Sequence, residues 1–438
     1  MACDTNPLEW TEDSLLRPAL FFLIILATAA QTRAATAPAW RAEVDALKAK
    51  GDAAGALARL EQVEQNSKPS AALEDEMGFL LAVLNQRAGA LDRFRKAIAI
   101  DPKFASAHYH LGVALWLEGN REAALPALEQ AAHLGPKVFD YRYRYGAALM
   151  DLGRDADAVA ECKIATSLQA GSAAAWNQLG LALQRQGDRK AAAAAYAKAV
   201  EIEPTNTDFR NNYGLMLLES GAPVKAIEQF EALLTRDPGN LGALGNIGLT
   251  YLNQGNLTKA IEQFEKVLQL DPTSAIVQYN LGLAYKQKDD LANAKLHLRR
   301  ATELDPRIAE AHFTLGVVHW QDGEFADVIR EMRAAIDVSP NYAEAYYLLG
   351  TALKQSGRPA EAIAALTEAI RLNPKTPGPF TLLGQILRAK GDADGSRQAF
   401  AEAARIKKQK ESEQKTMFDR AAMETVGPAA GMRMDRKP

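Results

Sequence analysis

The sequence predicts an all-α fold built from a long array of paired, antiparallel helices. Three observations support this: a 34-residue repeat, scarce strand-forming residues, and a composition with 48% hydrophobic but only 7% aromatic residues. Such a composition favours alanine-rich helices in close contact over a large aromatic core. Glycine marks the repeat at ten positions with constant spacing: 78, 112, 146, 180, 214, 248, 282, 316, 350 and 384.

Two further series of residues follow the same period. A second glycine stands at positions 119, 153, 187, 221, 255, 323, 357 and 391, with Asn85 and Asp289 as exceptions. Proline stands at positions 102, 136, 204, 238, 272, 306, 340 and 374, with Ala170 as the exception. We expect the second glycine to end the first helix of each unit, because glycine tolerates positive φ. Proline ends the second helix, since the residue before it avoids the α region.

The first glycine lies inside a helix, where it costs roughly 1 kcal/mol relative to alanine. Close packing between the two helices of a unit would offset this cost. We expect each such glycine to lie against a small residue of the second helix, as in the pairs Gly112 with Ala124 and Gly350 with Ala362.

The repeat resembles the tetratricopeptide repeat (TPR) over residues 71–410. In the unit Ala275 to Ile308, five features match the residue types of that family: Leu281-Gly282, Tyr285, Ala294, Ala301 and Pro306. The resemblance implies an α-solenoid that coils as a right-handed superhelix, with ten repeats: 71–104, 105–138, 139–172, 173–206, 207–240, 241–274, 275–308, 309–342, 343–376 and 377–410.

The two ends of the chain differ from the array. Residues 35–70 keep the rhythm of helix, glycine, helix but lack the first glycine, which indicates a diverged N-terminal repeat or cap. A polar closing helix is expected around Ala399 to Lys415. Residues 411–438 are predicted to form a polar, disordered tail, because the sequence beyond Phe418 has no apolar period.

Residues 1–34 are predicted to be a signal-peptide-like leader. The run from Ala19 to Ala30 has 12 apolar residues, which is too short to span a bilayer comfortably, and small residues follow it. The preceding stretch is acidic rather than basic, which translation starting near Leu15 or Leu16 would explain. The leader predicts export to the periplasm or the medium, with an uncleaved membrane anchor as the alternative.

Charge and cysteine content exclude several classes of function. The 51 basic and 54 acidic residues give a net charge of −3, without the basic excess of nucleic-acid binding proteins. The two cysteines, Cys3 and Cys162, make no disulfide framework in a processed chain, and Cys162 is expected to be a buried, inert thiol.

Common catalytic signatures are absent from the sequence, so we expect no enzyme activity and no cofactor. His312 and His319 lie seven residues apart on one predicted helix. No acidic or cysteine partner is evident for them in the sequence, and we interpret them as structural rather than metal-binding.

The predicted binding surface is the concave face of the first helices, at the fifth and sixth residues of each repeat. Aromatic and amide residues recur there, and they can contact the backbone and side chains of an extended peptide. The candidate partner-binding residues are Tyr109, Tyr143, Arg144, Asn177, Asn211, Asn212, Asn246, Tyr279, Asn280, Phe313 and Tyr347.

The asparagines of this face are similar to the asparagine ladder in the TPR superhelix of O-GlcNAc transferases, although this chain has no catalytic domain. We call the residues at one position of successive repeats a row. The alternative is that the fifth and sixth rows only follow the family pattern. The carboxylate clamp of chaperone-binding TPR domains is not matched, because the second and fifth rows lack lysine and the ninth row lacks asparagine.

The sequence therefore predicts a non-enzymatic scaffold that holds a protein or extended peptide in a concave groove outside the cytoplasm. The alternative is a periplasmic structural component of a polysaccharide-secretion or envelope-assembly complex, which rests on family analogy.

Overall fold

The computed structural model describes residues 39–425, which fold into helices without a strand in that range. The chain divides into two compact units at residue 222. The predicted leader lies outside the described residues. None of the helices within 39–425 combines the length and apolar character that a membrane span requires.

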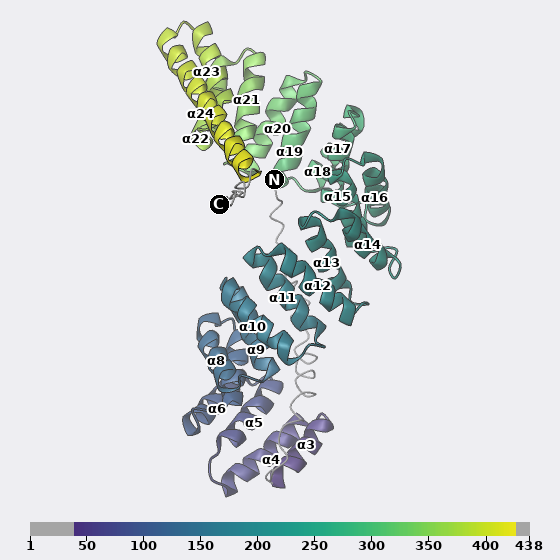
Figure 1. Cartoon of the computed structure of the whole chain (residues 1–438), viewed down its shortest axis with the longest axis vertical. Coiled ribbons are helices and arrows are strands. Elements are labelled where there is room, and N and C mark those ends of the chain that lie inside the picture. The colour runs from purple at the N-terminus through teal and green to yellow at the C-terminus, as the bar shows by residue number, and fades with distance from the viewer. Residues whose placement is uncertain (1–38, 426–438) are drawn as a thin grey trace, which may run out of the picture. The chain divides into compact units, whose positions relative to one another are not determined.

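The first unit contains eleven described helices (Figure 1). They are α3 (Ala39–Ala49), α4 (Ala53–Asn66), α5 (Ala71–Val83), α6 (Arg87–Ile100), α7 (Ala105–Leu117), α8 (Arg121–Leu134), α9 (Phe139–Asp151), α10 (Asp155–Leu168), α11 (Ala173–Gln186), α12 (Arg189–Ile202) and α13 (Thr207–Glu219).

The second unit contains the remaining eleven described helices. They are α14 (Pro223–Leu234), α15 (Leu241–Asn253), α16 (Leu257–Leu270), α17 (Ala275–Gln287), α18 (Leu291–Leu304), α19 (Ala309–Gln321), α20 (Phe325–Val338), α21 (Ala343–Gln355), α22 (Pro359–Leu372), α23 (Pro377–Ala389) and α24 (Ala393–Thr425).

Within each unit, every helix packs against the helix before it and the helix after it. First helices of neighbouring repeats also contact each other, as α9 and α11 do in the first unit and α17 and α19 in the second. Each hairpin therefore buries its apolar faces against its neighbours, which is the packing of an α-solenoid. The all-α solenoid of antiparallel helix pairs is confirmed.

The second glycine series has the predicted backbone conformation. Its eight glycines have φ between 70° and 89°, in the left-handed region that ends a helix. The two exceptions, Asn85 and Asp289, adopt the same conformation with φ of 60° and 62°. Asparagine and aspartate tolerate this region better than other side chains, so they can replace glycine at the turn.

The first glycine series packs differently from our expectation. A Cβ atom at Gly248 would lie 2.6 Å from Cε1 of Phe264, and one at Gly112 would lie 2.7 Å from Cγ of Leu128. The expected approach to a small residue is present for Gly350, where a Cβ would lie 3.3 Å from the carbonyl oxygen of Ala362, but for Gly112 the three nearest atoms all belong to Leu128 and not to Ala124. The missing side chain makes room for the residue sixteen positions later, which is usually large.

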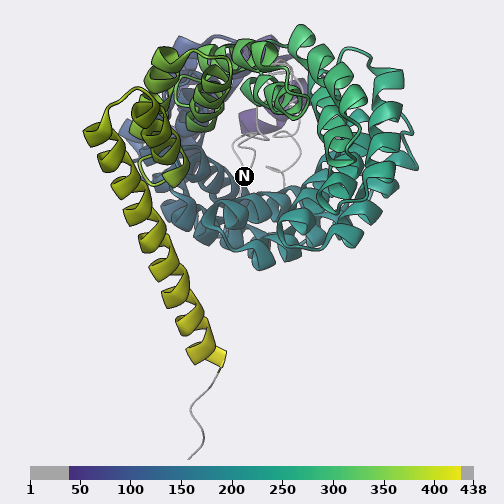
Figure 2. The ribbon, with the colours of Figure 1, turned by 90° about the horizontal axis from the view of Figure 1, so that it is seen from above.

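The last helix is longer than predicted. We expected the closing helix to end near Lys415, yet α24 continues to Thr425. Figure 2 shows its C-terminal part projecting beyond the other helices of the second unit. Ile406 is the last buried residue of α24 among those whose burial the structure describes, and the segment that follows is rich in lysine, glutamate and glutamine. Such residues propagate a helix readily once its packed N-terminal part has nucleated it.

Candidate functional site

The predicted binding residues of the first unit lie on α7, α9, α11 and α13, at the same height of successive repeats. Tyr109 is buried, with only 6% of its surface exposed. The others are half-buried: Tyr143, Arg144, Asn177, Asn211 and Asn212. None of these six side chains is therefore fully open to solvent.

Sixth-row side chains of the first unit bind the preceding repeat. Asn212 donates from Nδ2 to Oδ1 of Asn177 at 3.0 Å, and Gln178 donates from Nε2 to the carbonyl oxygen of Tyr143 at 2.9 Å. Each bond joins the sixth residue of one repeat to the fifth residue of the repeat before it. These side chains thus have a role within the fold, whatever they contribute to binding.

The same register places His110 beside Asp75. Nδ1 of His110 lies 2.8 Å from Oδ1 of Asp75, whose other oxygen accepts a hydrogen bond from the Ser106 hydroxyl at 2.7 Å. Burial alone would lower the pKa of His110, but the charge and hydrogen bond of Asp75 outweigh it and hold that pKa above its ordinary value. The rings of Phe79 and Phe94 lie 5.5 Å from the imidazole.

In the second unit the amides and the aromatic residues differ in exposure. Asn280 is buried, at 7% exposure, and Asn246 is half-buried. The fifth row carries aromatic residues in three consecutive repeats: Tyr279 and Phe313 are half-buried, and Tyr347 is 36% exposed. The fifth row of this unit therefore presents more accessible apolar surface than the sixth.

A cavity of about 480 Å³ lies at the end of this aromatic row. Tyr347 and Thr381, both in the fifth row, line it together with Gln385. Phe400 and Lys407 of α24 close the opposite side. The cavity combines an apolar wall with a cationic rim and contains no acidic side chain in its lining.

A buried polar pair that the sequence analysis missed recurs within the repeats. It joins the fourth residue of a repeat to the residue nineteen positions later, on the second helix. The pairs are Glu74 with Arg93 at 2.9 Å, Arg142 with Glu161 at 2.7 Å, Gln278 with His297 at 2.8 Å, and His312 with Glu331 at 2.8 Å. The shared spacing was visible in the sequence, but the residue types change from repeat to repeat.

These contacts correct our interpretation of the two histidines. We expected no acidic partner for either, yet His312 binds Glu331, and Nδ1 of His319 is hydrogen-bonded to Glu324. Glu331 lies on α20 and Glu324 lies just before it. A search for partners along α19 alone could not find them. Cys162, in contrast, is buried as expected, and burial raises the pKa of its thiol to about 12.

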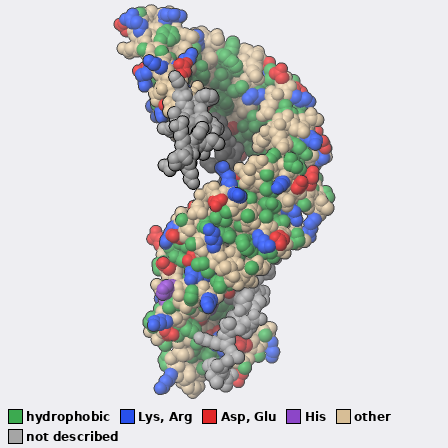
Figure 3. Space-filling model, viewed as in Figure 1, with side chains coloured by type: hydrophobic (Ala, Val, Ile, Leu, Met, Phe, Trp, Pro, Cys, Tyr) green, Lys and Arg blue, Asp and Glu red, His purple; other side chains and the backbone are tan. Residues whose placement is uncertain are grey.

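Charges of both signs are interspersed on the face shown in Figure 3, and neither sign forms a continuous patch there. This mixture of charges on the face shown agrees with the near-zero net charge of the chain.

A solenoid of helical hairpins with repeated side-chain rows on its first helices is the architecture of a protein-interaction scaffold. The chain belongs to the tetratricopeptide-repeat proteins. Residues 164–276 match the TPR domain family of cytochrome c-type biogenesis protein H. General tetratricopeptide-repeat families match residues 83–119, 115–175, 279–343, 323–377 and 347–411.

Several solved TPR structures are similar to parts of the chain. MamA is 28% identical over 38% of this chain and 97% of its own, with a TM-score of 0.37. YrrB, described as a TPR protein with an unusual peptide-binding site, is 23% identical over 45% of this chain and 99% of its own, with a TM-score of 0.37. PilF of Pseudomonas aeruginosa is 21% identical over 50% of this chain and 97% of its own, with a TM-score of 0.42. No curated protein matches the chain in sequence.

Proposed function

We propose that this protein is a non-enzymatic scaffold that holds an extended peptide or a partner domain against the first helices of its repeats, outside the cytoplasm. The observation that carries the proposal is the aromatic row Tyr279, Phe313 and Tyr347, which repeats at the 34-residue period on the second unit. Membership of the TPR family supports protein binding in general.

The chemistry of the aromatic side chains favours this row as the contact surface. Tyrosine and phenylalanine bury a large apolar area, and tyrosine adds a hydroxyl that can hydrogen-bond to a peptide backbone. The cavity beside Tyr347 is large enough to accept a partner side chain, and Lys407 at its rim favours an acidic group next to that side chain.

The polar residues do not suggest a reaction. The pairs of a carboxylate with arginine or histidine at the fourth position join the two helices of a single repeat, and they are partly or fully buried. Cys162, with its raised pKa, is a poor nucleophile. These roles favour a scaffold over an enzyme.

The row can be tested by capture of partners from an envelope fraction. We expect the combined substitution of Tyr279, Phe313 and Tyr347 by alanine to abolish recovery of the proteins that the unchanged chain retains. The control is Leu296→Ala on α18, because Leu296 is 60% exposed but lies on a second helix. Equal recovery by the triple variant and the control would remove the row from the binding surface.

The location outside the cytoplasm rests on the leader-like residues 1–34. Mass spectrometry of the mature N-terminus tests it: cleavage after Ala29, Ala30 or Ala34 supports export, and an intact N-terminus in a membrane fraction supports an anchor. The alternative function is a structural component of a polysaccharide-secretion or envelope-assembly complex. Genes for glycosyltransferases and an outer-membrane barrel beside this one would favour that alternative.

A further inference from the structure

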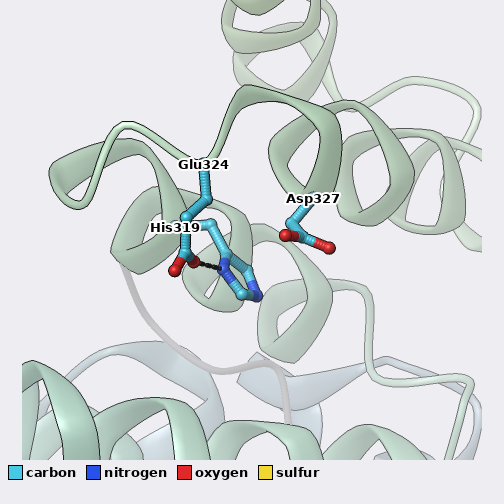
Figure 4. A group of neighbouring side chains, drawn as sticks. All are labelled: His319, Glu324 and Asp327. Atoms are coloured by element: carbon cyan, nitrogen blue, oxygen red, sulfur yellow. Dashed lines mark hydrogen bonds and ion pairs between the residues drawn. The ribbon is translucent and has the colours of Figure 1, made fainter.

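A histidine and two carboxylates meet where α19 turns into α20. His319 lies in the last turn of α19, Glu324 is the residue immediately before the first residue of α20, and Asp327 lies in the first turn of α20. One ring nitrogen of His319 and one oxygen of each carboxylate all lie within 4.8 Å of one another. Figure 4 shows the imidazole between the two carboxylates, with Glu324 on one side and Asp327 on the other.

His319 is unusual at its place in the repeat. It is the eleventh residue of its unit and is only 2% exposed. The same position in the other nine repeats carries leucine or tyrosine: Leu81, Leu115, Leu149, Leu183, Leu217, Tyr251, Tyr285, Leu353 and Leu387. An imidazole in this row is not needed for helix packing, because seven repeats pack with leucine.

The hydrogen bonding of the ring leaves one nitrogen available. Nδ1 is hydrogen-bonded to the Glu324 carboxylate, so in the neutral ring Nδ1 carries the proton and Nε2 carries the lone pair. Nε2 is buried and has no hydrogen-bond partner among the described residues. A buried polar atom without a partner is unfavourable, and here it is also a potential ligand.

This arrangement is the one in which histidine binds metal ions in proteins. A ligating imidazole usually donates its other N–H to a carboxylate, which fixes the ring and raises its basicity. We propose that His319 and Asp327 bind a zinc ion, through Nε2 and a carboxylate oxygen, and that Glu324 positions the ring from Nδ1. Water would occupy the remaining coordination positions of the ion.

The neighbouring cations are compatible with this site. Lys295 lies 2.7 Å from Glu324 and can keep that pair when the ion binds, because Glu324 is not a direct ligand. Asp327 must release Arg330, with which it forms an ion pair. That pair is exposed, with 60% of the Arg330 side chain and 35% of the Asp327 side chain accessible, so its loss costs little stability. Arg330 also has a second partner, Glu331, at 3.0 Å.

The chemistry of the donors selects the ion. Imidazole together with carboxylate suits zinc, whereas magnesium prefers oxygen ligands alone. Zinc, but not magnesium, is therefore expected to bind the purified protein at this site.

The test is zinc binding by equilibrium dialysis after treatment of the purified protein with a chelator. We expect His319→Leu and Asp327→Asn each to bind one equivalent less than the unchanged protein. Glu324→Gln should bind zinc about 10-fold to 100-fold more weakly, as the loss of an orienting carboxylate does in other sites. Leucine is native to this row, so His319→Leu should fold, and circular dichroism checks this.

The control is Asp157→Asn. Asp157 occupies the position of Asp327 in another repeat and pairs with Arg154 at 2.7 Å, but that repeat has Leu149 in place of the histidine. Its substitution should leave zinc binding unchanged. The proposal is overturned if the unchanged protein binds no zinc, or if His319→Leu and Asp327→Asn retain full stoichiometry. It is also overturned if magnesium competes equally.

Discussion

Replacing Gly248 with alanine places a methyl group against the buried ring of Phe264. The new Cβ would lie 2.6, 2.8 and 3.1 Å from three carbon atoms of that ring, closer than the roughly 3.5–4.0 Å of normal contact. Phe264 is 0% exposed, so its ring cannot turn into solvent. Overpacking of this kind costs about 1–3 kcal/mol, while the better helix propensity of alanine returns about 1 kcal/mol. The net loss of stability should be between about 0 and 2 kcal/mol.

Gly245 provides a matched control on the same helix, α15. A Cβ at Gly245 meets no atom within 4 Å, so Gly245→Ala should stabilise the protein by about 0.8–1.0 kcal/mol. The propensity gain cancels between the two variants, and their difference of about 1–3 kcal/mol measures the strain alone. Gly146→Ala should be milder than Gly248→Ala, because its nearest neighbour is Sγ of Cys162 at 3.0 Å.

Denaturant unfolding followed by circular dichroism would rank the three variants. Repeat arrays can unfold in parts, so hydrogen exchange of α15 and α16 should accompany it to locate the change. If Gly248→Ala proves as stable as Gly245→Ala, the close approach to Phe264 is not the reason for the glycine series.

Three further predictions concern His110, Cys162 and Asp289. Burial lowers the pKa of His110, but Asp75 raises it above the ordinary value of about 6.5. The contact therefore contributes its full stabilisation at a pH below 6.5, and this contribution is lost as the pH rises through the raised pKa. His110→Asn, which introduces the amide of later repeats, should remove this part of the pH dependence when unfolding midpoints are compared between about pH 6 and 9. Cys162 should react with a thiol reagent only after unfolding, because burial raises its pKa to about 12; rapid labelling of the native protein would contradict this. Asp289→Gly should raise the free energy of unfolding by up to about 1 kcal/mol, seen as a higher unfolding midpoint, because φ is 62° there and other repeats carry glycine. A lower midpoint would show that the aspartate side chain stabilises the turn.

The fold was predictable because its backbone geometry requires particular residue types. Only a residue that tolerates positive φ can end the first helix, and this holds even for Asn85 and Asp289. The partner of the first glycine was not predictable in the same way. Phenylalanine, leucine, tyrosine, methionine and cysteine all occur sixteen residues later, so no single residue type marks the contact.

The candidate site was only partly predictable. The fifth and sixth rows were identified from the period, but their burial and mutual hydrogen bonds depend on how adjacent repeats stack. The bond from Asn212 to Asn177 is an example, since both residues were chosen as ligands for a partner. The length of α24 was missed because the absence of an apolar period was taken as disorder, although helix propagation does not need one.

The repeats serve as references for one another, and this separates structural from functional explanations. Where a position carries the same residue type in nearly every repeat, as the glycines do, backbone geometry accounts for it. Where a buried pair keeps its spacing but exchanges its residue types, as Glu74 with Arg93 and Arg142 with Glu161 do, complementarity within the repeat accounts for it. His319 fits neither case, because a buried imidazole stands alone in a row of leucine and tyrosine and retains a nitrogen without a partner among the described residues. A buried nitrogen that neither backbone geometry nor the pairing of His319 with Glu324 explains is the strongest indication of a ligand, and it directs the first binding experiments to α19 and α20.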